Sequence, residues 1–217
     1  MLTFALPTGR TLSDCIDILA GAGMPAEKLK NPGRSLVIEE GQIRYLLSKP
    51  ADVPMMVHYG AADMGLAGSD VICESGIQIS ELLDTGRGRC TMAVAGPAET
   101  AEKFKGHVSG LMGLKVATKY PNIAEQTFAA WGVHIKLMKL NGSVELAPAL
   151  GLSDCIFDIV QTGSTLRANG LIVIKETASV SLRLIAGTGA MRLKWNTMFA
   201  VTETVKNFIK VGVKDEK

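Results

Sequence analysis

Short apolar runs alternate along the chain with segments whose apolar residues recur at helical spacing. Residues 2–6 form an apolar run typical of a buried strand, and the segment at 11–22 places Ile16, Ile18 and Leu19 on one side of a helix that ends at the glycines of 21–23. The same pattern predicts strands at 35–39, 43–47, 64–67, 89–95, 114–118, 133–140, 155–160, 171–177 and 180–186, and helices at 53–57, 70–75, 122–131, 143–150, 164–169 and 190–210.

The alternation of strands with helices predicts an α/β fold with largely parallel sheets. Residues 97–113 are polar and punctuated by glycine, so we expect the chain to cross between two lobes near residue 96. Ligands of such folds bind at the carboxyl ends of strands, so the informative positions are those where a strand runs into a glycine turn.

Composition excludes several classes of function. Of the 217 residues, 47% are hydrophobic, 20% are charged and only 5% are aromatic, with a formal net charge of +2. These values are ordinary for a globular protein and give no basis for a nucleic-acid partner. No run reaches the ~20 apolar residues that span a bilayer. The N-terminal sequence MLTFALPTGR is broken by Pro7 and Gly9 and has no preceding basic region, so we expect a cytoplasmic protein without a signal peptide or a membrane partner.

The cysteines and histidines are too dispersed to predict a metal site. The four cysteines, at 15, 73, 90 and 155, include no CxxC pair, and the three histidines, at 58, 107 and 134, are equally scattered. We therefore expect reduced, mostly buried thiols and no zinc site.

The segment DCIFDIVQTGSTL, residues 154–166, combines a buried strand with a run of small hydroxylated residues. Gly163 permits a tight turn, and the hydroxyls of Thr162, Ser164 and Thr165 add donors to the free N–H groups of the helix that follows. These donors would bind the oxygens of a phosphate monoester. Asp158, just upstream, is placed to accept hydrogen bonds from sugar hydroxyls or to approach Mg²⁺.

An ordinary capped helix after a strand is the alternative explanation of this segment. The chain contains neither GxxxxGK[ST] nor GxGxxG, so neither a P-loop nor a dinucleotide fingerprint competes with the phosphate hypothesis.

Residues 145–166, ELAPALGLSDCIFDIVQTGSTL, resemble the signature of the ATP phosphoribosyltransferase family. The matching positions are Glu145, Gly151, Ser153, Asp158 and the TGSTL of 162–166. Further blocks similar to the family lie at 5–10, 51–76, 117–128, 139–148 and 165–171.

This resemblance implies a type II periplasmic-binding-protein-like fold, in which two α/β lobes face a cleft. We expect residues 1–95 and 180–217 to form the first lobe and residues 96–179 to form the second, which carries the phosphoribosyl-binding loop. The chain length resembles the short form of the family. The resemblance therefore implies self-association and a hetero-oligomer with a regulatory subunit related to histidyl-tRNA synthetase.

The implied reaction is the first step of histidine biosynthesis. N1 of the adenine of ATP attacks the anomeric carbon of phosphoribosyl pyrophosphate, and pyrophosphate leaves with Mg²⁺. The reaction needs alignment of two polyanions and no protein nucleophile.

The resemblance also implies roles for individual residues. The 5-phosphate is held by Thr162, Gly163, Ser164 and Thr165. Asp158 contacts the ribose hydroxyls or their Mg²⁺, which is held mostly through the substrate, and Asp154 is a second candidate for this contact. Glu145 positions a substrate or serves as a polar residue of its helix.

Two arginines complete the expected site. Arg10 and Arg34 face the departing pyrophosphate or the ATP phosphates, because a guanidinium fork matches phosphate oxygens. Two positions depart from the family pattern: Thr8 replaces a frequent lysine, and Gln161 replaces a frequent acid or serine. Neither departure alters Asp158 or the loop donors.

Two other functions are compatible with the residues alone. A different phosphoribosyltransferase with a smaller base would use the same loop. A non-catalytic receptor of the same fold would bind a small ligand without turnover, since fold does not determine function.

Overall fold

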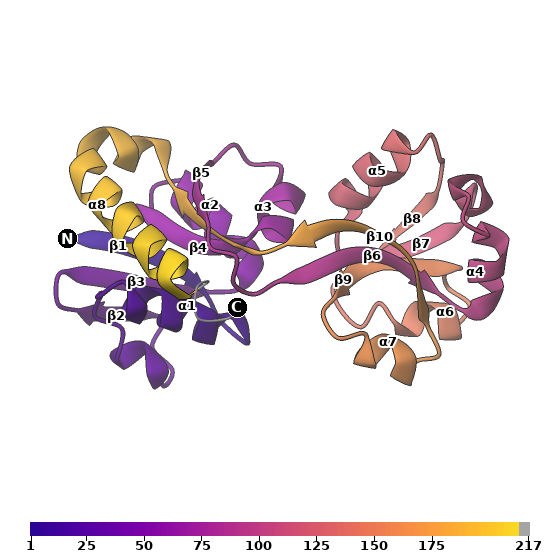
Figure 1. Cartoon of the computed structure of the whole chain (residues 1–217), viewed down its shortest axis with the longest axis horizontal. Coiled ribbons are helices and arrows are strands. Elements are labelled where there is room, and N and C mark those ends of the chain that lie inside the picture. Colours follow the sequence, from indigo (N-terminus) through magenta and orange to yellow (C-terminus); the bar gives the residue numbers. More distant parts are fainter. Residues whose placement is uncertain (213–217) are drawn as a thin grey trace. The chain divides into compact units, whose positions relative to one another are not determined.

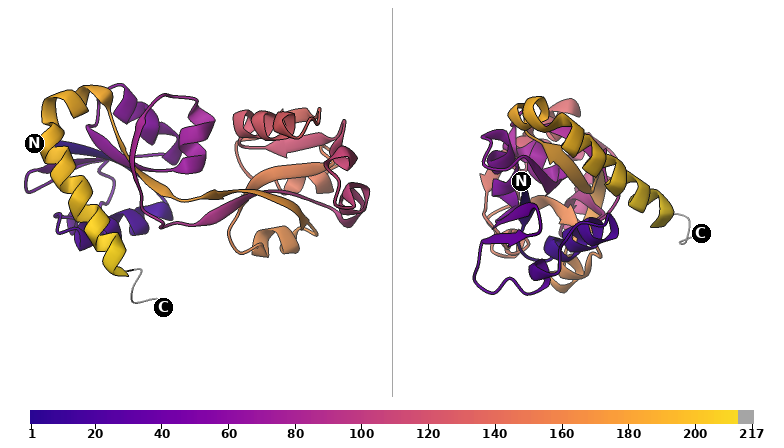
Figure 2. Two further views of the ribbon diagram at one scale, coloured as in Figure 1. Left: turned by 45° about the horizontal axis from the view of Figure 1, so that its top comes forward. Right: turned by 90° about the vertical axis from the view of Figure 1, so that its left-hand side faces the viewer.

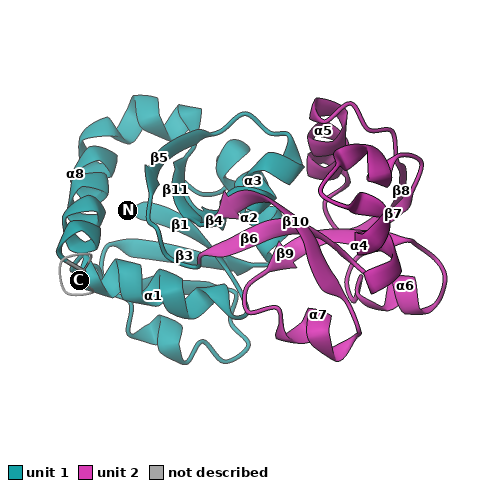
Figure 3. Ribbon diagram, turned by 45° about the vertical axis from the view of Figure 1, so that its right-hand side comes forward, with its two compact units in different colours: residues 1–88, 181–217 teal, residues 89–180 magenta. Residues whose placement is uncertain are grey.

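The computed structural model describes residues 1–212 and divides the chain into two compact units (Figure 3). Unit 1 contains residues 1–88 and the chain from residue 181 onward, and unit 2 is the continuous segment Arg89–Val180. Unit 2 is therefore an insertion in unit 1.

Unit 1 is built on a six-stranded mixed sheet with the order β2-β3-β1-β4-β11-β5 (Figure 1). Its strands are β1 (Leu2–Pro7), β2 (Val37–Glu40), β3 (Ile43–Ser48), β4 (Met64–Gly68), β5 (Ser80–Asp84) and β11 (Leu182–Ala186). Strand β1 runs parallel to β3 and β4, whereas β2 is antiparallel to β3 and β11 is antiparallel to both β4 and β5. The ends of β1, β3 and β4 therefore lie at one edge, which we call the carboxyl edge of unit 1.

Helices cover both faces of this sheet. The helices of unit 1 are α1 (Thr11–Gly21), α2 (Val53–His58), α3 (Ser69–Ser75) and α8 (Thr188–Gly212), with short 3-10 turns at Lys28–Lys30 and Pro50–Asp52. Side chains of β1 alternate, so Phe4 and Leu6 pack with α1 and α8, while Ala5 packs with α2 and α3. Figure 2 shows α8 lying across unit 1 beside α1. This close approach depends on Gly21, because a Cβ there would lie 2.2 Å from the ring of Phe208.

Unit 2 is built on a five-stranded mixed sheet with the order β10-β6-β9-β7-β8. Its strands are β6 (Cys90–Gly96), β7 (Lys115–Thr118), β8 (Lys136–Lys139), β9 (Cys155–Val160) and β10 (Ile172–Val180). Its helices are α4 (Ala98–Phe104), α5 (Pro121–Ala130), α6 (Leu146–Ala149) and α7 (Ser164–Ala168), with a 3-10 turn at Val108–Leu111. Strand β7 is parallel to β8 and β9, so these three strands end at one edge, the carboxyl edge of unit 2.

Two apolar clusters cover the two faces of the sheet in unit 2. One contains Phe157 of β9 and Phe128 of α5. The other contains Ile156 of β9, Ala147 of α6 and Leu166 of α7. Helices α6 and α7 therefore pack on the same face of the sheet.

The α/β class is confirmed, but the expectation of largely parallel sheets is wrong. Strands β6, β10 and β11 run antiparallel to their neighbours. The chain passes from unit 1 to unit 2 after Gly88 rather than after residue 95, because β6 pairs with β9 and β10 of unit 2. The return follows Val180 rather than residue 179. No helix within residues 1–212 is both long and apolar enough to cross a bilayer.

Candidate functional site

The proposed phosphate loop connects β9 to α7 at the carboxyl edge of unit 2. Gly163 has φ +68°, the left-handed conformation that favours glycine, and it directly precedes the first residue of α7. Thr162 Oγ1 and Ser164 Oγ share a hydrogen bond of 2.9 Å, and the Ser164 N–H donates to Thr162 Oγ1 at 3.4 Å. Thr162, Ser164 and Thr165 are all exposed. The loop thus presents hydroxyl donors to solvent around one glycine.

Asp158 lies on the side of β9 that faces α6 and α7. Side chains alternate along β9: Phe157 belongs to the opposite cluster, whereas Ile156 and Val160 on either side of Asp158 belong to the cluster that contains α7. The Asp158 carboxylate is half-buried and accepts a hydrogen bond from the N–H of Ile159 at 2.8 Å. The fold therefore brings Asp158 and the phosphate loop to the same face and the same edge.

Glu145 immediately precedes α6 and is half-buried. It follows the end of β8, and its neighbours Val144 and Ala147 pack in the same apolar cluster as Leu166 of α7. Glu145 makes no side-chain hydrogen bond that caps α6. Glu145 therefore lies on the face and at the edge of the sheet that also carry the phosphate loop.

Asp154 lies at the other end of β9. Its Oδ2 accepts a hydrogen bond from the N–H of Lys115 at 2.7 Å, and its own N–H donates to the Lys115 carbonyl at 2.8 Å. These two bonds tie the start of β9 to the start of β7. The six residues of β9, about 20 Å of extended chain, separate Asp154 from the phosphate loop, so the structure does not bring these two parts of the expected site together.

Arg10 and Arg34 both lie at the carboxyl edge of unit 1. Arg10 follows β1 through Gly9, which has φ +88°, and the preceding Thr8 N–H donates to the Ser48 carbonyl at the end of β3. Arg34 precedes β2, which begins beside the end of β3 because the two strands are antiparallel. Both arginines are exposed. Two guanidinium groups therefore share one edge, as an anion site requires.

Asp70 is a further candidate, in the first turn of α3. The residue at the N-cap of α3 is Gly68, which has no side chain to cap the helix, and Asp70 is only 7% exposed. Its carboxylate lies against Gly68, where a Cβ would be 2.1 Å from Oδ1. A buried carboxylate at the carboxyl edge of unit 1 is suited to accept a hydrogen bond from a substrate. The sequence indicates such a position by an apolar strand whose last residue, Gly68, is followed directly by Ser69 and Asp70.

The described residues offer no ready-made metal site. Within residues 1–212, no group of three or more His, Cys, Asp or Glu side chains could hold a metal ion. Mg²⁺ usually binds one or two carboxylates together with substrate phosphates, so a single carboxylate such as Asp158 is compatible with an ion held mostly by substrate.

Burial affects the ionisation of the cysteine thiols. None of the four takes part in a disulfide, and only Cys15 and Cys155 are buried, fewer than expected. Burial, reinforced by the charge of Asp154, raises the pKa of the Cys155 thiol to about 12. A protonated thiol is a poor nucleophile, which agrees with a reaction that needs none.

The two mixed sheets, each packed with helices in its own unit, define a class, the two-unit α/β proteins. The periplasmic aliphatic sulphonate binding protein SsuA from Escherichia coli shares this fold, with a TM-score of 0.63 over 99% of this chain and 74% of that one. Its identity of 13% shows the fold alone. The expectation of a periplasmic-binding-protein-like fold is thereby confirmed.

Closer relatives identify the family. The family model for ATP phosphoribosyltransferase matches residues 49–209. The ATP phosphoribosyltransferases of Aquifex aeolicus and Caldanaerobacter subterraneus subsp. tengcongensis are 46% and 43% identical, each over 89% of this chain and over 88% and 90% of their own lengths. The ATP phosphoribosyl transferase (HisG:HisZ) complex from Thermotoga maritima contains a chain with 30% identity and a TM-score of 0.80, matched over 97% of this chain and 99% of that one.

The chain belongs to the ATP phosphoribosyltransferase family. The enzymes of this family are metal-dependent transferases, and they catalyse the first step of histidine biosynthesis.

Proposed function

We propose that the chain transfers the phosphoribosyl group of phosphoribosyl pyrophosphate to N1 of ATP and that unit 2 holds the phosphoribosyl end of the donor. The observation that carries this assignment is the placement of Asp158 and the exposed TGST loop on one face and one edge of a single sheet. The loop donors bind the 5-phosphate, and Asp158 accepts hydrogen bonds from the ribose hydroxyls. Glu145, on the same face, positions a substrate.

The chemistry requires alignment and charge stabilisation. The N1 lone pair forms the new bond to the anomeric carbon as the bond from that carbon to the pyrophosphate oxygen breaks. Arg10 and Arg34 stabilise the negative charge of the leaving pyrophosphate or orient the ATP phosphates. Thr8 carries no charge, so the arginines provide cationic contacts at an edge where relatives often add a lysine.

We propose Mg²⁺ as the metal, bound mainly by the pyrophosphate oxygens, with Asp158 as the protein residue suited to approach it. When bound, the ion neutralises charge on the leaving group.

We also propose that the chain associates with itself and with a regulatory subunit related to histidyl-tRNA synthetase. The support is the structure from Thermotoga maritima, whose relative of this chain is part of a HisG:HisZ complex. We propose a cytoplasmic location, as expected for a biosynthetic enzyme of this family.

Pyrophosphate release tests the proposal directly. The purified chain is assayed with ATP, phosphoribosyl pyrophosphate and Mg²⁺, alone and with the candidate regulatory subunit, while absorbance follows the nucleotide product. Release that requires both substrates supports the transferase. Binding of phosphoribosyl pyrophosphate without turnover in either setting would instead favour a receptor, and turnover with another base would favour a different phosphoribosyltransferase.

A further inference from the structure

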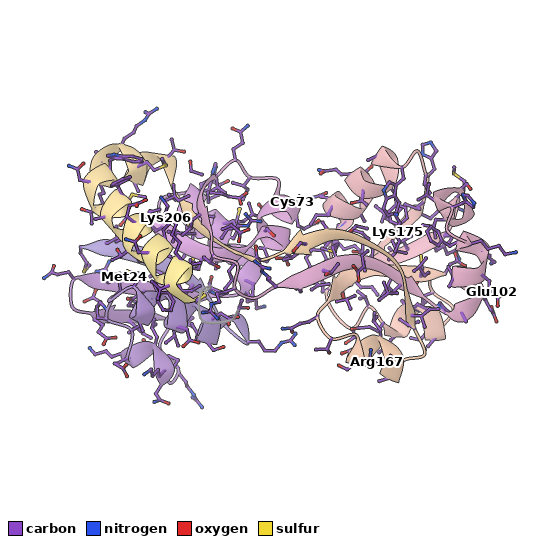
Figure 4. The ribbon with its side chains drawn as sticks, in the orientation of Figure 1. Met24, Cys73, Glu102, Arg167, Lys175 and Lys206 are labelled. Carbon is purple, nitrogen blue, oxygen red and sulfur yellow. The ribbon has the colours of Figure 1, made fainter. Side chains whose placement is uncertain are left out.

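We propose that Arg167 is a substrate-binding residue whose guanidinium contacts the 5-phosphate of phosphoribosyl pyrophosphate. This inference rests on the proposed function, because it adds a residue to the same phosphate loop. Arg167 lies on α7 of unit 2 and is labelled in Figure 4.

The guanidinium of Arg167 lies against the glycine of the loop. A Cβ built on Gly163 would be 3.1 Å from Arg167 Nη1 and 4.0 Å from Cζ. The Arg167 N–H donates to the Gly163 carbonyl at 3.0 Å, so one helical turn fixes the base of the side chain below the loop. The missing side chain at residue 163 leaves the space that the guanidinium occupies.

None of the described residues neutralises the positive charge of Arg167. Within residues 1–212, the guanidinium forms no ion pair and donates no hydrogen bond to another residue, whereas Arg44 and Arg183 both pair with carboxylates. Arg167 is exposed, so water solvates its N–H groups in the free enzyme. A cation held beside the loop without an anionic partner is available to a ligand.

The chemistry of the group selects the ligand. A guanidinium presents five N–H donors in a planar fork that matches two oxygens of a phosphate. The adjacent hydroxyls of Thr162 and Ser164 supply neutral donors, and Gln161 adds no negative charge to oppose an anion. Arg167 would supply one positive charge and the loop would supply neutral donors, so together they would offer both kinds of contact to a phosphate.

Steady-state kinetics of Arg167→Ala tests this assignment, with Arg167→Lys as the conservative variant. A charge-assisted hydrogen bond contributes enough that Arg167→Ala is expected to raise the KM for phosphoribosyl pyrophosphate about 10- to 100-fold, with the KM for ATP unchanged. Arg167→Lys keeps the charge without the fork and is expected to give an intermediate KM. Lys103→Ala, which removes an exposed charge from α4 of the same unit, is the matched control and is expected to leave both KM values unchanged.

Two competitive inhibitors locate the contact on the substrate. Ribose 5-phosphate carries only the 5-phosphate, so Arg167→Ala is expected to raise its Ki by the same factor as the KM for phosphoribosyl pyrophosphate. The Ki for inorganic pyrophosphate is expected to stay at the wild-type value. An equal rise for pyrophosphate would assign Arg167 to the leaving group and overturn the inference.

The failure of this inference is distinguishable from failure of the proposed function. An active wild-type enzyme with unchanged constants in Arg167→Ala would remove Arg167 from the site and leave the transferase intact. If the wild-type enzyme releases no pyrophosphate, either alone or with the candidate regulatory subunit, the proposed function itself is rejected.

Discussion

Alanine at position 163 separates the backbone role of the loop glycine from its role in binding phosphate. Gly163 has φ +68°, and an L-residue in this left-handed conformation costs about 1–2 kcal/mol. The lower entropy of the unfolded chain offsets about 0.4–1 kcal/mol of that cost. We therefore expect Gly163→Ala to lower the free energy of unfolding by about 1 kcal/mol, which lowers Tm by about 2–4 °C in a chain of this length.

The added methyl group also meets the guanidinium of Arg167. The contact would be 3.1 Å, closer than ordinary van der Waals distance, and it involves the far end of a flexible side chain. The side chain moves away at little cost to folding, but the guanidinium then leaves the loop. We expect the KM for phosphoribosyl pyrophosphate to rise about 10-fold, as for loss of one charge-assisted contact, while the KM for ATP stays constant.

Gly170→Ala is the matched control for this variant. Gly170 follows α7, has φ +69°, and has no atom within 4 Å of a built Cβ. Gly170→Ala therefore carries the same backbone cost without touching the loop. Thermal unfolding and steady-state kinetics on both variants give the comparison. Equal KM values for the two variants would refute the placement of phosphate at Gly163.

Three further predictions address other parts of the molecule. Asp158→Asn keeps an acceptor for the Ile159 N–H, so we expect Tm to change little while kcat/KM for phosphoribosyl pyrophosphate falls about 10- to 100-fold; unchanged kinetics would remove Asp158 from the site. Arg10→Ala is expected to lower kcat about 10- to 1000-fold with normal Tm, and a loss explained by unfolding alone would make Arg10 structural. The raised pKa of Cys155, about 12, means that the folded state binds a proton that the unfolded thiol releases above pH 9, so stability falls as pH rises from 9 to 12. Cys155→Ala is expected to be less stable at neutral pH but to lose stability less steeply over that range in urea titrations, and parallel curves would refute this linkage.

The elements that the sequence predicts best are those with strong apolar patterns. Strand β9 and the glycine turn behind it occur where the pattern places them. Strand β5 was missed because its residues, SELLD, are largely polar and half-exposed at the edge of the sheet, where burial imposes no alternation. The direction of β6 and β10 was not predictable either, because apolar periodicity is the same in parallel and antiparallel strands.

Two features depend on contacts between residues distant in sequence, which the sequence pattern does not reveal. The apolar pattern predicts one helix over 190–210, yet α8 begins at Thr188 and is interrupted at Lys194, which has φ −126°. The ammonium of Lys194 pairs with Asp63 at 2.7 Å, so a contact distant in sequence fixes the irregularity. Asp154 and Asp158 occur in one signature block, but the block does not reveal that a whole strand separates Asp154 from the loop.

The insertion of unit 2 into unit 1 determines the order in which the ribosome supplies complete folding units. Unit 2 is continuous, so all its strands are available once Val180 has emerged. The sheet of unit 1 remains open at that stage, because β11 lies between β4 and β5 and is synthesised last of the six strands. One edge of β4 therefore stays unpaired until β11 has been synthesised. This order makes the interval between synthesis of β4 and β11 the period in which nascent chains expose an edge to aggregation or to chaperones.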